Sequence, residues 1–153
     1  MDIKQPDHGP GGGMGGTVRP YEVTPIGWVE SPLTEPAHAP RQGYLGAPQA
    51  WLVFTAGVAE GIRDLRAGEH IIVLSWLDRA RRDELSTVPG DSPGSPPRGV
   101  FSTRSPSRPN PIGLHRVQIL AIDGLRVLVS DLEALDRTPI LDVKPVLDPG
   151  AER

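Results

Sequence analysis

Short stretches in which hydrophobic and polar residues alternate recur along most of the chain, a pattern typical of β-strands. The most apolar stretch, residues 70–77, predicts a core strand. Further strands are predicted over residues 23–29, 51–54, 100–103, 117–122, 125–131 and 140–146. Asp123 and Gly124 join two of these strands, and this dipeptide is favoured in tight β-hairpins.

One short helix is predicted over residues 58–65, because Val58, Ile62 and Leu65 recur at helical spacing and Gly68 follows as a stop. The strands do not alternate with long helices, as the strands of a parallel sheet would. The 18 glycines and 18 prolines among 153 residues also disfavour a helical bundle. The predicted fold is therefore mostly β: a small antiparallel β-barrel or folded sheet with one or two short helices.

The length and the composition predict one domain, residues 21–148. A flexible tail rich in glycine and proline precedes it over residues 1–20, and a short tail follows over residues 149–153. The glycines within residues 11–16 match the spacing of a dinucleotide-binding loop, but no strand precedes them and no helix follows, so we reject that interpretation. Residues 31–46 and 88–98 are predicted loops, the second long and mobile, and whether it closes over a site is left open.

The composition excludes several classes of function. The absence of cysteine rules out disulfides, thiolate metal sites and cysteine nucleophiles, and it suits a cytoplasmic protein. The four histidines lie too far apart for a metal site, and the longest aliphatic run is too short for a membrane span, so we expect neither a metal nor a membrane partner. A net charge of −3 provides no global positive field for a nucleic-acid duplex. A serine hydrolase is disfavoured because no Gly-x-Ser-x-Gly elbow lies between a strand and a helix.

The first candidate site is the stretch of residues 103–113, which three prolines make stiff. The surrounding residues 98–122 hold no acidic residue and four arginines: Arg98, Arg104, Arg108 and Arg116. Arginine binds carboxylates and phosphates through two parallel hydrogen bonds and can stack on a base. Asn110 offers a donor and an acceptor to an adenine edge or to a neighbouring turn. The alternative is a stiff surface loop with solvated arginines.

The second candidate site is residues 135–145. Asp136 is followed by Thr138 and Pro139, which predicts a turn with side-chain acceptors. Asp142 and Lys144 lie two residues apart on a predicted strand, hence on the same face. An exposed ion pair with little energetic weight is the alternative there. The charged run 78–84 is read as a solvated helix face with local pairing, or else as an edge of the binding surface.

Three separated blocks resemble the TsaA-like, or TrmO, family of tRNA methyltransferases, which use S-adenosylmethionine. The blocks are Pro40-Arg41-Gln42, residues 99–113, and residues 135–145 without the glycine that the family usually has at position 137. Their order and spacing match from about Ile26 to Leu147. The resemblance implies a small β-barrel methyltransferase that works as a homodimer, with cofactor pockets close to the subunit interface.

The resemblance also implies site residues, carried over by position. The cofactor would be bound by Pro40, Arg41, Gln42, Asp78, Arg79, Arg104, Leu114, Leu135, Asp136, Arg137 and Thr138. Arg41 and Arg104 are assigned to a carboxylate of the cofactor or substrate, and Gln42 and Asp136 to polar fixing of the cofactor. The substrate would be bound by Arg108, Asn110, Arg116 and Lys144, with Asp142 or His115 as the candidate proton acceptor.

This chain departs from the family pattern at several of these positions. Arg137 stands where the family usually has glycine, Val146 replaces a tyrosine, and His115 and Arg116 replace the usual residues after Gly-Leu. The best-known bacterial enzyme carries a further C-terminal domain, so we expect part of its tRNA contact to be missing here.

The expected function is N-methylation of the threonylcarbamoyl-modified adenosine beside the tRNA anticodon. Two alternatives stay open: methylation of a small molecule, and a non-catalytic module that binds S-adenosylmethionine.

Overall fold

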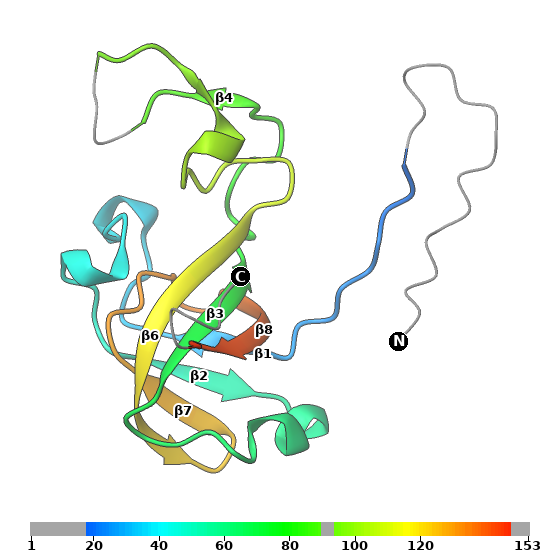
Figure 1. The fold of residues 1–153 in the computed structure, drawn as a ribbon, viewed down its shortest axis with the longest axis vertical. Coiled ribbons are helices and arrows are strands. Elements are labelled where there is room, and N and C mark those ends of the chain that lie inside the picture. Colours follow the sequence, from blue (N-terminus) through cyan, green and yellow to red (C-terminus); the bar gives the residue numbers. More distant parts are fainter. Residues whose placement is uncertain (1–17, 90–93, 148–153) are drawn as a thin grey trace.

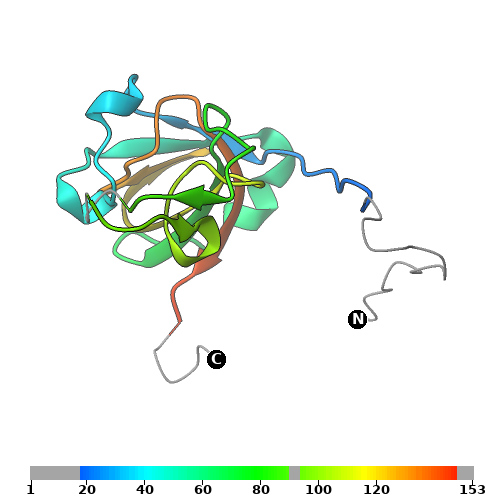
Figure 2. The same cartoon turned by 90° about the horizontal axis from the view of Figure 1, so that it is seen from above.

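The chain forms a closed β-barrel that carries a smaller arm at one end (Figures 1 and 2). The computed structural model describes residues 18–89 and 94–147. The strands are β1 (Gly27–Glu30), β2 (Ala50–Phe54), β3 (His70–Trp76), β4 (Ser86–Thr87), β5 (Arg98–Gly99), β6 (Ile112–Asp123), β7 (Arg126–Val129) and β8 (Pro139–Pro145). Short 3-10 helices connect them: η1 (Pro36–His38), η2 (Gly43–Leu45), η3 (Ala56–Ile62) and η4 (Val100–Ser102). The predicted small antiparallel barrel is confirmed.

The barrel strands follow the order β1-β2-β7-β6-β3-β8, and every neighbouring pair is antiparallel. The short pairing of β8 with β1, at Gly27↔Ile140 and Trp28↔Pro139, closes the circle. Closure gives each of the six barrel strands a neighbour on both sides, whereas β4 and β5 pair only with each other. The 12-residue β6 is the longest strand and reaches from the arm to the far end of the barrel (Figure 1).

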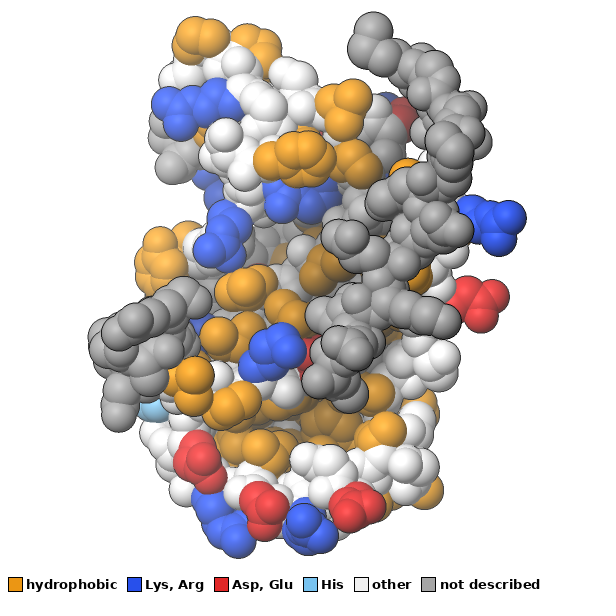
Figure 3. Space-filling model, turned by 45° about the vertical axis from the view of Figure 1, so that its right-hand side comes forward, with side chains coloured by type: hydrophobic (Ala, Val, Ile, Leu, Met, Phe, Trp, Pro, Cys, Tyr) orange, Lys and Arg blue, Asp and Glu red, His pale blue; other side chains and the backbone are white. Residues whose placement is uncertain are grey.

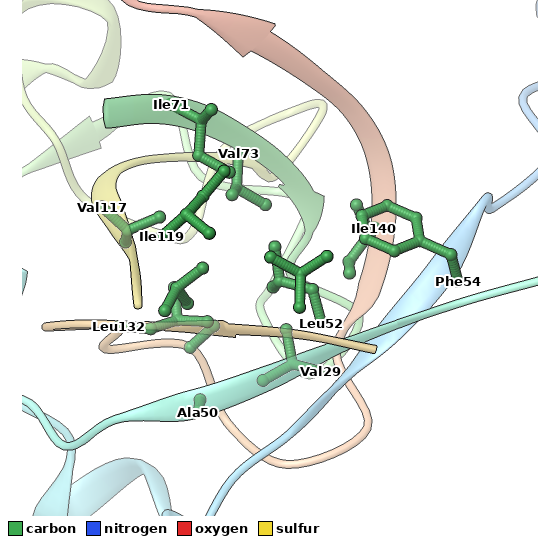
Figure 4. Close-up of a cluster of buried hydrophobic side chains, with 13 residues drawn as sticks. Val29, Ala50, Leu52, Phe54, Ile71, Val73, Val117, Ile119, Leu132 and Ile140 are labelled. Carbon is green, nitrogen blue, oxygen red and sulfur yellow. The ribbon is translucent and has the colours of Figure 1, made fainter. Parts of the chain in front are cut away.

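The barrel interior is filled by aliphatic side chains from every strand (Figure 4). Residues alternate along each strand, so that one half of them points into the barrel and the other half outward. The fully buried members include Val29, Leu52, Ile71, Val73, Ile119, Val127, Val129 and Ile140. This core fixes which side chains of β3, β6 and β8 face outward, where several candidate site residues lie.

The arm is the stretch of residues 77–111, which leaves the barrel after β3 and returns to it as β6 (Figure 1, green to yellow). Its strands β4 and β5 pair at Ser86↔Gly99 and Thr87↔Arg98. The predicted loop 88–98 therefore connects the two strands of a hairpin. Residues 90–93 of this loop lie outside the described part of the chain. Whether this loop closes over a site stays untested.

The predicted helix over residues 58–65 is instead the 3-10 helix η3. Its sequence contains Gly57 and Gly61, each of which lowers helix stability by about 1 kcal/mol relative to alanine. Val58, Ile62 and the following Leu65 still pack against the barrel core. The hydrophobic spacing therefore identified the buried face and misjudged the type of helix.

Three strand predictions also needed correction. Instead of a strand over residues 100–103, Val100–Ser102 forms the 3-10 helix η4, in which Val100 is buried and Phe101 is 80% exposed. Strand β6 begins at Ile112, five residues before the predicted start, because the inward positions Gly113 and His115 interrupt the apolar alternation. Strand β1 begins only at Gly27, after Pro25.

The predicted tails 1–20 and 149–153 lie almost entirely outside the described residues. Within residues 18–89 and 94–147, no helix is long and apolar enough to span a membrane. No group of three or more His, Asp or Glu residues in the same ranges could hold a metal ion.

Candidate functional site

The segment that follows β1, residues 31–34, connects two of the predicted cofactor blocks. The Ser31 amide donates to Asp136 Oδ1 at 3.0 Å, and the Asp136 amide donates to the Leu33 carbonyl at 2.7 Å. The Arg79 guanidinium donates to the Thr34 carbonyl at 2.8 Å. Asp136 and Arg79 therefore bind one short segment, which leads directly into the loop that carries Pro40, Arg41 and Gln42.

The turn at residues 135–138 is held by the Thr138 side chain and by a hydrogen bond to β1. Thr138 donates to the Leu135 carbonyl through its amide and its hydroxyl, at 3.1 and 2.7 Å. The Arg137 amide donates to the Val29 carbonyl at 2.6 Å. Arg137 has φ 68°, a left-handed conformation that favours glycine, and its side chain is 91% exposed. Arg137 thus adopts a backbone conformation that favours glycine and places a cation at the surface.

An open groove of about 800 Å³ begins at this turn. Its lining is Pro25, Gly27, Trp28, Val29, Glu30, Asp136, Arg137 and Pro139. Trp28, which is 46% exposed, contributes an aromatic surface to this groove. Of the predicted cofactor residues, Asp136 and Arg137 line this groove, and Arg41, Gln42, Arg79 and Arg104 do not.

The loop with Pro40, Arg41 and Gln42 is anchored through the glycine that follows it. The Ala47 amide donates to the Gly43 carbonyl at 3.1 Å, and the Leu45 amide to the Gln42 carbonyl at 3.0 Å. A side chain on Gly43 would collide with the Asp131 carbonyl oxygen, so only glycine allows this close approach. The guanidinium groups of Arg41 and Arg104 are exposed and have no hydrogen-bond or ion-pair partner within the described ranges. Both are available to bind an anion.

Two predicted substrate residues in the arm are already engaged in structural contacts. Arg108 donates to the carbonyls of Val100 and Thr103, the latter at 2.7 Å, and its Nε is buried without a partner. Asn110 Oδ1 accepts a hydrogen bond from Arg82 at 3.0 Å. Arg108 therefore braces η4, and the bond between Arg82 and Asn110 joins the two ends of the arm.

The other predicted residues share the outer face of the barrel. Leu114 of β6 and Asp142 of β8 both pair with Leu74 of β3, from its two sides. In the next row, Arg116 and Lys144 flank Ile72 in the same way. Lys144 Nζ lies 2.8 Å from Asp142 Oδ2, which is the exposed ion pair considered from the sequence. These four residues form one surface.

His115 lies on the opposite side of the same barrel wall. Its side chain is 4% exposed and points inward, and its backbone pairs with Val73. The imidazole Nε2 lies 2.6 Å from Ser75 Oγ, and Nδ1 lies 2.5 Å from Glu133 Oε1. Of the two candidate proton acceptors, only Asp142 faces outward with Arg116 and Lys144.

The charged run 78–84 is not helical; it makes local ion pairs on the arm. Arg81 donates to both carboxylate oxygens of Asp83, at 3.1 and 3.0 Å, and lies 3.4 Å from Glu84. Its hydrogen bonds hold the pKa of Asp83 below the usual value, and the same bonds raise the pKa of Arg81. Within this run, Arg81 makes ion pairs at the surface, whereas Arg79 donates a hydrogen bond to the Thr34 carbonyl.

A family model for the N-terminal domain of tRNA-methyltransferase O matches residues 28–149. The chain belongs to the tRNA-methyltransferase O family. The match contains all three blocks that carried the sequence resemblance: Pro40-Arg41-Gln42, residues 99–113 and residues 135–145.

Relatives of the tRNA-methyltransferase O family support this assignment in sequence and in structure. An Archaeoglobus fulgidus protein named as S-adenosyl-L-methionine-binding is 46% identical over 123 residues, 80% of this chain and 86% of that protein. A probable S-adenosyl-L-methionine-binding protein of Methanothermobacter thermautotrophicus is 38% identical over 80% of this chain and 88% of its own length. A crystal structure of TrmO from Pseudomonas aeruginosa superposes with a TM-score of 0.67 at 29% identity. That superposition covers 88% of this chain, which spans 58% of the TrmO chain.

Several structural residues of this family member were not found from the sequence. Ser75 and Glu133, the partners of His115, look like an ordinary strand residue and an ordinary surface acid. Arg82 was read as part of a solvated run, yet it binds Pro109 and Asn110 and lies over Trp76. Only contacts between segments far apart in sequence identify these three.

Proposed function

We propose that this chain is an S-adenosylmethionine-dependent N-methyltransferase that acts on the threonylcarbamoyl-modified adenosine beside the tRNA anticodon. One observation carries the proposal: Asp136 and Arg79 both hydrogen-bond to residues 31–34. This segment precedes the loop that contains Pro40, Arg41 and Gln42. Family membership and the names of the archaeal relatives support the same cofactor.

The donor set fits the chemistry of S-adenosylmethionine. The exposed guanidinium groups of Arg41 and Arg104 suit the methionine carboxylate. Asp136 Oδ1 accepts from the Ser31 amide, and the side chain is 30% exposed. Oδ2 lies 3.9 Å from Arg137 Nε and has room to accept a further bond from a ribose hydroxyl or the ammonium group. The half-buried Gln42 offers an amide beside Arg41.

When bound, S-adenosylmethionine supplies an electrophilic methyl group on a sulfonium sulfur. The protein must then align the attacking nitrogen with that carbon and exclude water, with little acid–base chemistry. In the proposed mechanism Arg116 and Lys144 bind substrate phosphate on the outer face, and Asp142 takes the proton that the nitrogen releases. Asp142 is the proposed acceptor because it lies on that face, whereas His115 lies inside the barrel.

We further propose that the protein is a homodimer. The outer face of β6 and β3 supports this, because Ile112 and Leu114 are 45% and 46% exposed and adjoin Trp76 and Leu74. The molecule also exposes hydrophobic side chains elsewhere: several lie near the middle of the face that Figure 3 presents, with Lys and Arg side chains among them. A second copy that covered Ile112 and Leu114 would leave Arg116 and Lys144, which lie further along the same face, at the edge of the interface, and would bring further arginines to them.

Two observations favour the alternative of a small-molecule substrate. Arg108 and Asn110 are engaged within the arm, which leaves fewer groups for tRNA phosphates. The chain also has a net charge of −3. The names of the archaeal relatives state binding of S-adenosylmethionine alone, which keeps the non-catalytic alternative in the test.

The test is transfer of labelled methyl from S-adenosylmethionine to tRNA that carries the threonylcarbamoyl group without the methyl, with tRNA lacking the threonylcarbamoyl group as the control. We expect label only in the modified tRNA, and weaker tRNA binding as salt rises. Label in a small-molecule extract and none in tRNA would support the alternative. Cofactor binding without any transfer would support the non-catalytic module.

A further inference from the structure

A chain of three polar side chains lies inside the barrel wall below the proposed cofactor loop. Ser75 of β3, His115 of β6 and Glu133 are joined by contacts of 2.6 and 2.5 Å. Ser75 is fully buried, and the Glu133 side chain is 16% exposed. Buried polar groups are costly unless they are paired, so each of these groups depends on its neighbours.

The order Ser–His–Glu is that of a hydrolase triad, but the environment of Ser75 excludes this role. Its Oγ has no exposure to solvent, so no substrate can reach it. Gly113 leaves the space that the pair requires, because a side chain there would come within 2.5 Å of Ser75 Oγ and 2.7 Å of His115 Nε2. The chain of contacts is therefore packed into the wall as part of the structure.

The outer end of this chain reaches the loop that carries Pro40, Arg41 and Gln42. Gly43, the next residue, lies so close to Glu133 that a side chain on it would approach Oε2 to 3.1 Å. The neighbouring Asp131 carbonyl contacts the same glycine, and the Leu132 amide donates to the Pro48 carbonyl at 3.1 Å. Residues 131–133 thus lie between the barrel interior and both ends of the loop.

We propose that Ser75, His115 and Glu133 are positioning residues that hold the Pro40–Gly43 loop in its cofactor-binding conformation. His115 fixes the carboxylate of Glu133, and that carboxylate, with the Asp131 carbonyl, forms the surface on which Gly43 rests. The loop is then ordered before ligand arrives, which lowers the entropy lost on binding. The link to cofactor rests on the proposed function; the link to loop order does not.

Loop order is measured by limited trypsin digestion, because Arg41 is exposed in the loop and Arg66 is exposed at the far end of the barrel. In Glu133→Ala and His115→Ala we expect cleavage after Arg41 to become about tenfold faster, with cleavage after Arg66 unchanged. The double variant should be no faster than either single one, since both act through one contact. Glu133→Gln keeps a side-chain oxygen that accepts a hydrogen bond from His115. This variant should therefore be cleaved after Arg41 as slowly as the unaltered protein.

Two further variants keep the test decisive if the alanine variants fail to fold. Gly43→Ala places a methyl group against the Asp131 carbonyl, leaves Ser75, His115 and Glu133 in the sequence, and should reproduce the fast cleavage at Arg41. Glu60→Gln removes an exposed acid beside Arg63 and should change neither site. Equal acceleration at Arg41 and Arg66 in the Glu133 and His115 variants would show global destabilisation and overturn the proposal, as would unchanged cleavage at both.

Cofactor affinity provides the second readout. The dissociation constant for S-adenosylmethionine should rise about tenfold in Glu133→Ala, and the rise should vanish in an Arg41→Ala background. If Glu133→Ala weakened S-adenosylmethionine binding equally in the unaltered protein and in Arg41→Ala, Glu133 would not act through the loop. If the unaltered protein binds no S-adenosylmethionine, the proposed function fails, and the digestion result still decides whether the three residues position the loop.

Discussion

The guanidinium of Arg82 lies 5.1 Å from the centre of the Trp76 ring, where the arm joins the barrel. Arg82 also donates to the Pro109 carbonyl at 2.8 Å and to Asn110 Oδ1 at 3.0 Å. One side chain therefore links the end of β3 to the residues just before β6. The arm carries Arg79 and Arg104, so its attachment to the barrel bears directly on the proposed site.

Arg82→Ala should lower the free energy of unfolding by about 1 kcal/mol, because it removes two hydrogen bonds and a cation–π contact at a solvent-exposed position. Arg81→Ala is the matched control, since Arg81 makes only exposed ion pairs with Asp83 and Glu84. Urea denaturation of both variants measures the difference. Equal losses in the two variants would show that Arg82 is no more than another surface charge.

Arg137→Gly should raise the free energy of unfolding by about 0.5 kcal/mol. Glycine relieves the left-handed strain at φ 68°, and this gain exceeds the entropy that glycine adds to the unfolded chain. Asp131→Gly is the control, because Asp131 has φ 49° and aspartate tolerates this region better than arginine does. A less stable Arg137→Gly protein, measured by thermal unfolding, would contradict the argument.

Part of this architecture could be predicted from the sequence, and the missing part has physical reasons. Strand β3 was predicted to within one residue because its apolar residues, Ile71 to Leu74 and Trp76, are interrupted only by Ser75. The first half of β6 was missed because Gly113 and His115 occupy inward positions where an aliphatic residue would signal a strand. Short motifs located the turn at Asp136 and the loop at Arg41. Ser75 and Glu133 carried no local signal, because their contacts depend on the closure of the barrel.

The carboxyl group of Asp83 should titrate below the usual range for aspartate, because Arg81 donates two hydrogen bonds to it and lowers its pKa. A pKa lowered by folding means that the pair stabilises the fold above the unfolded pKa of aspartate. That contribution is lost as the pH falls through the folded pKa. Carbon-13 NMR titration should show the pKa of Asp83 return to the usual range in Arg81→Ala and stay low in Arg79→Ala. A low pKa in Arg81→Ala would assign the shift to another cause.

The most direct test of the central claim is calorimetric titration of the purified protein with S-adenosylmethionine, with methionine and ATP as control ligands. We expect saturable binding near one cofactor per chain, with micromolar affinity as the order of magnitude for a pocket of this kind. Arg41→Ala and Arg104→Ala should each weaken binding at least tenfold while the fold is retained, since both side chains are exposed and unpaired within the described residues. Absence of binding by the unaltered protein, or full affinity in both variants, would contradict the proposed cofactor site.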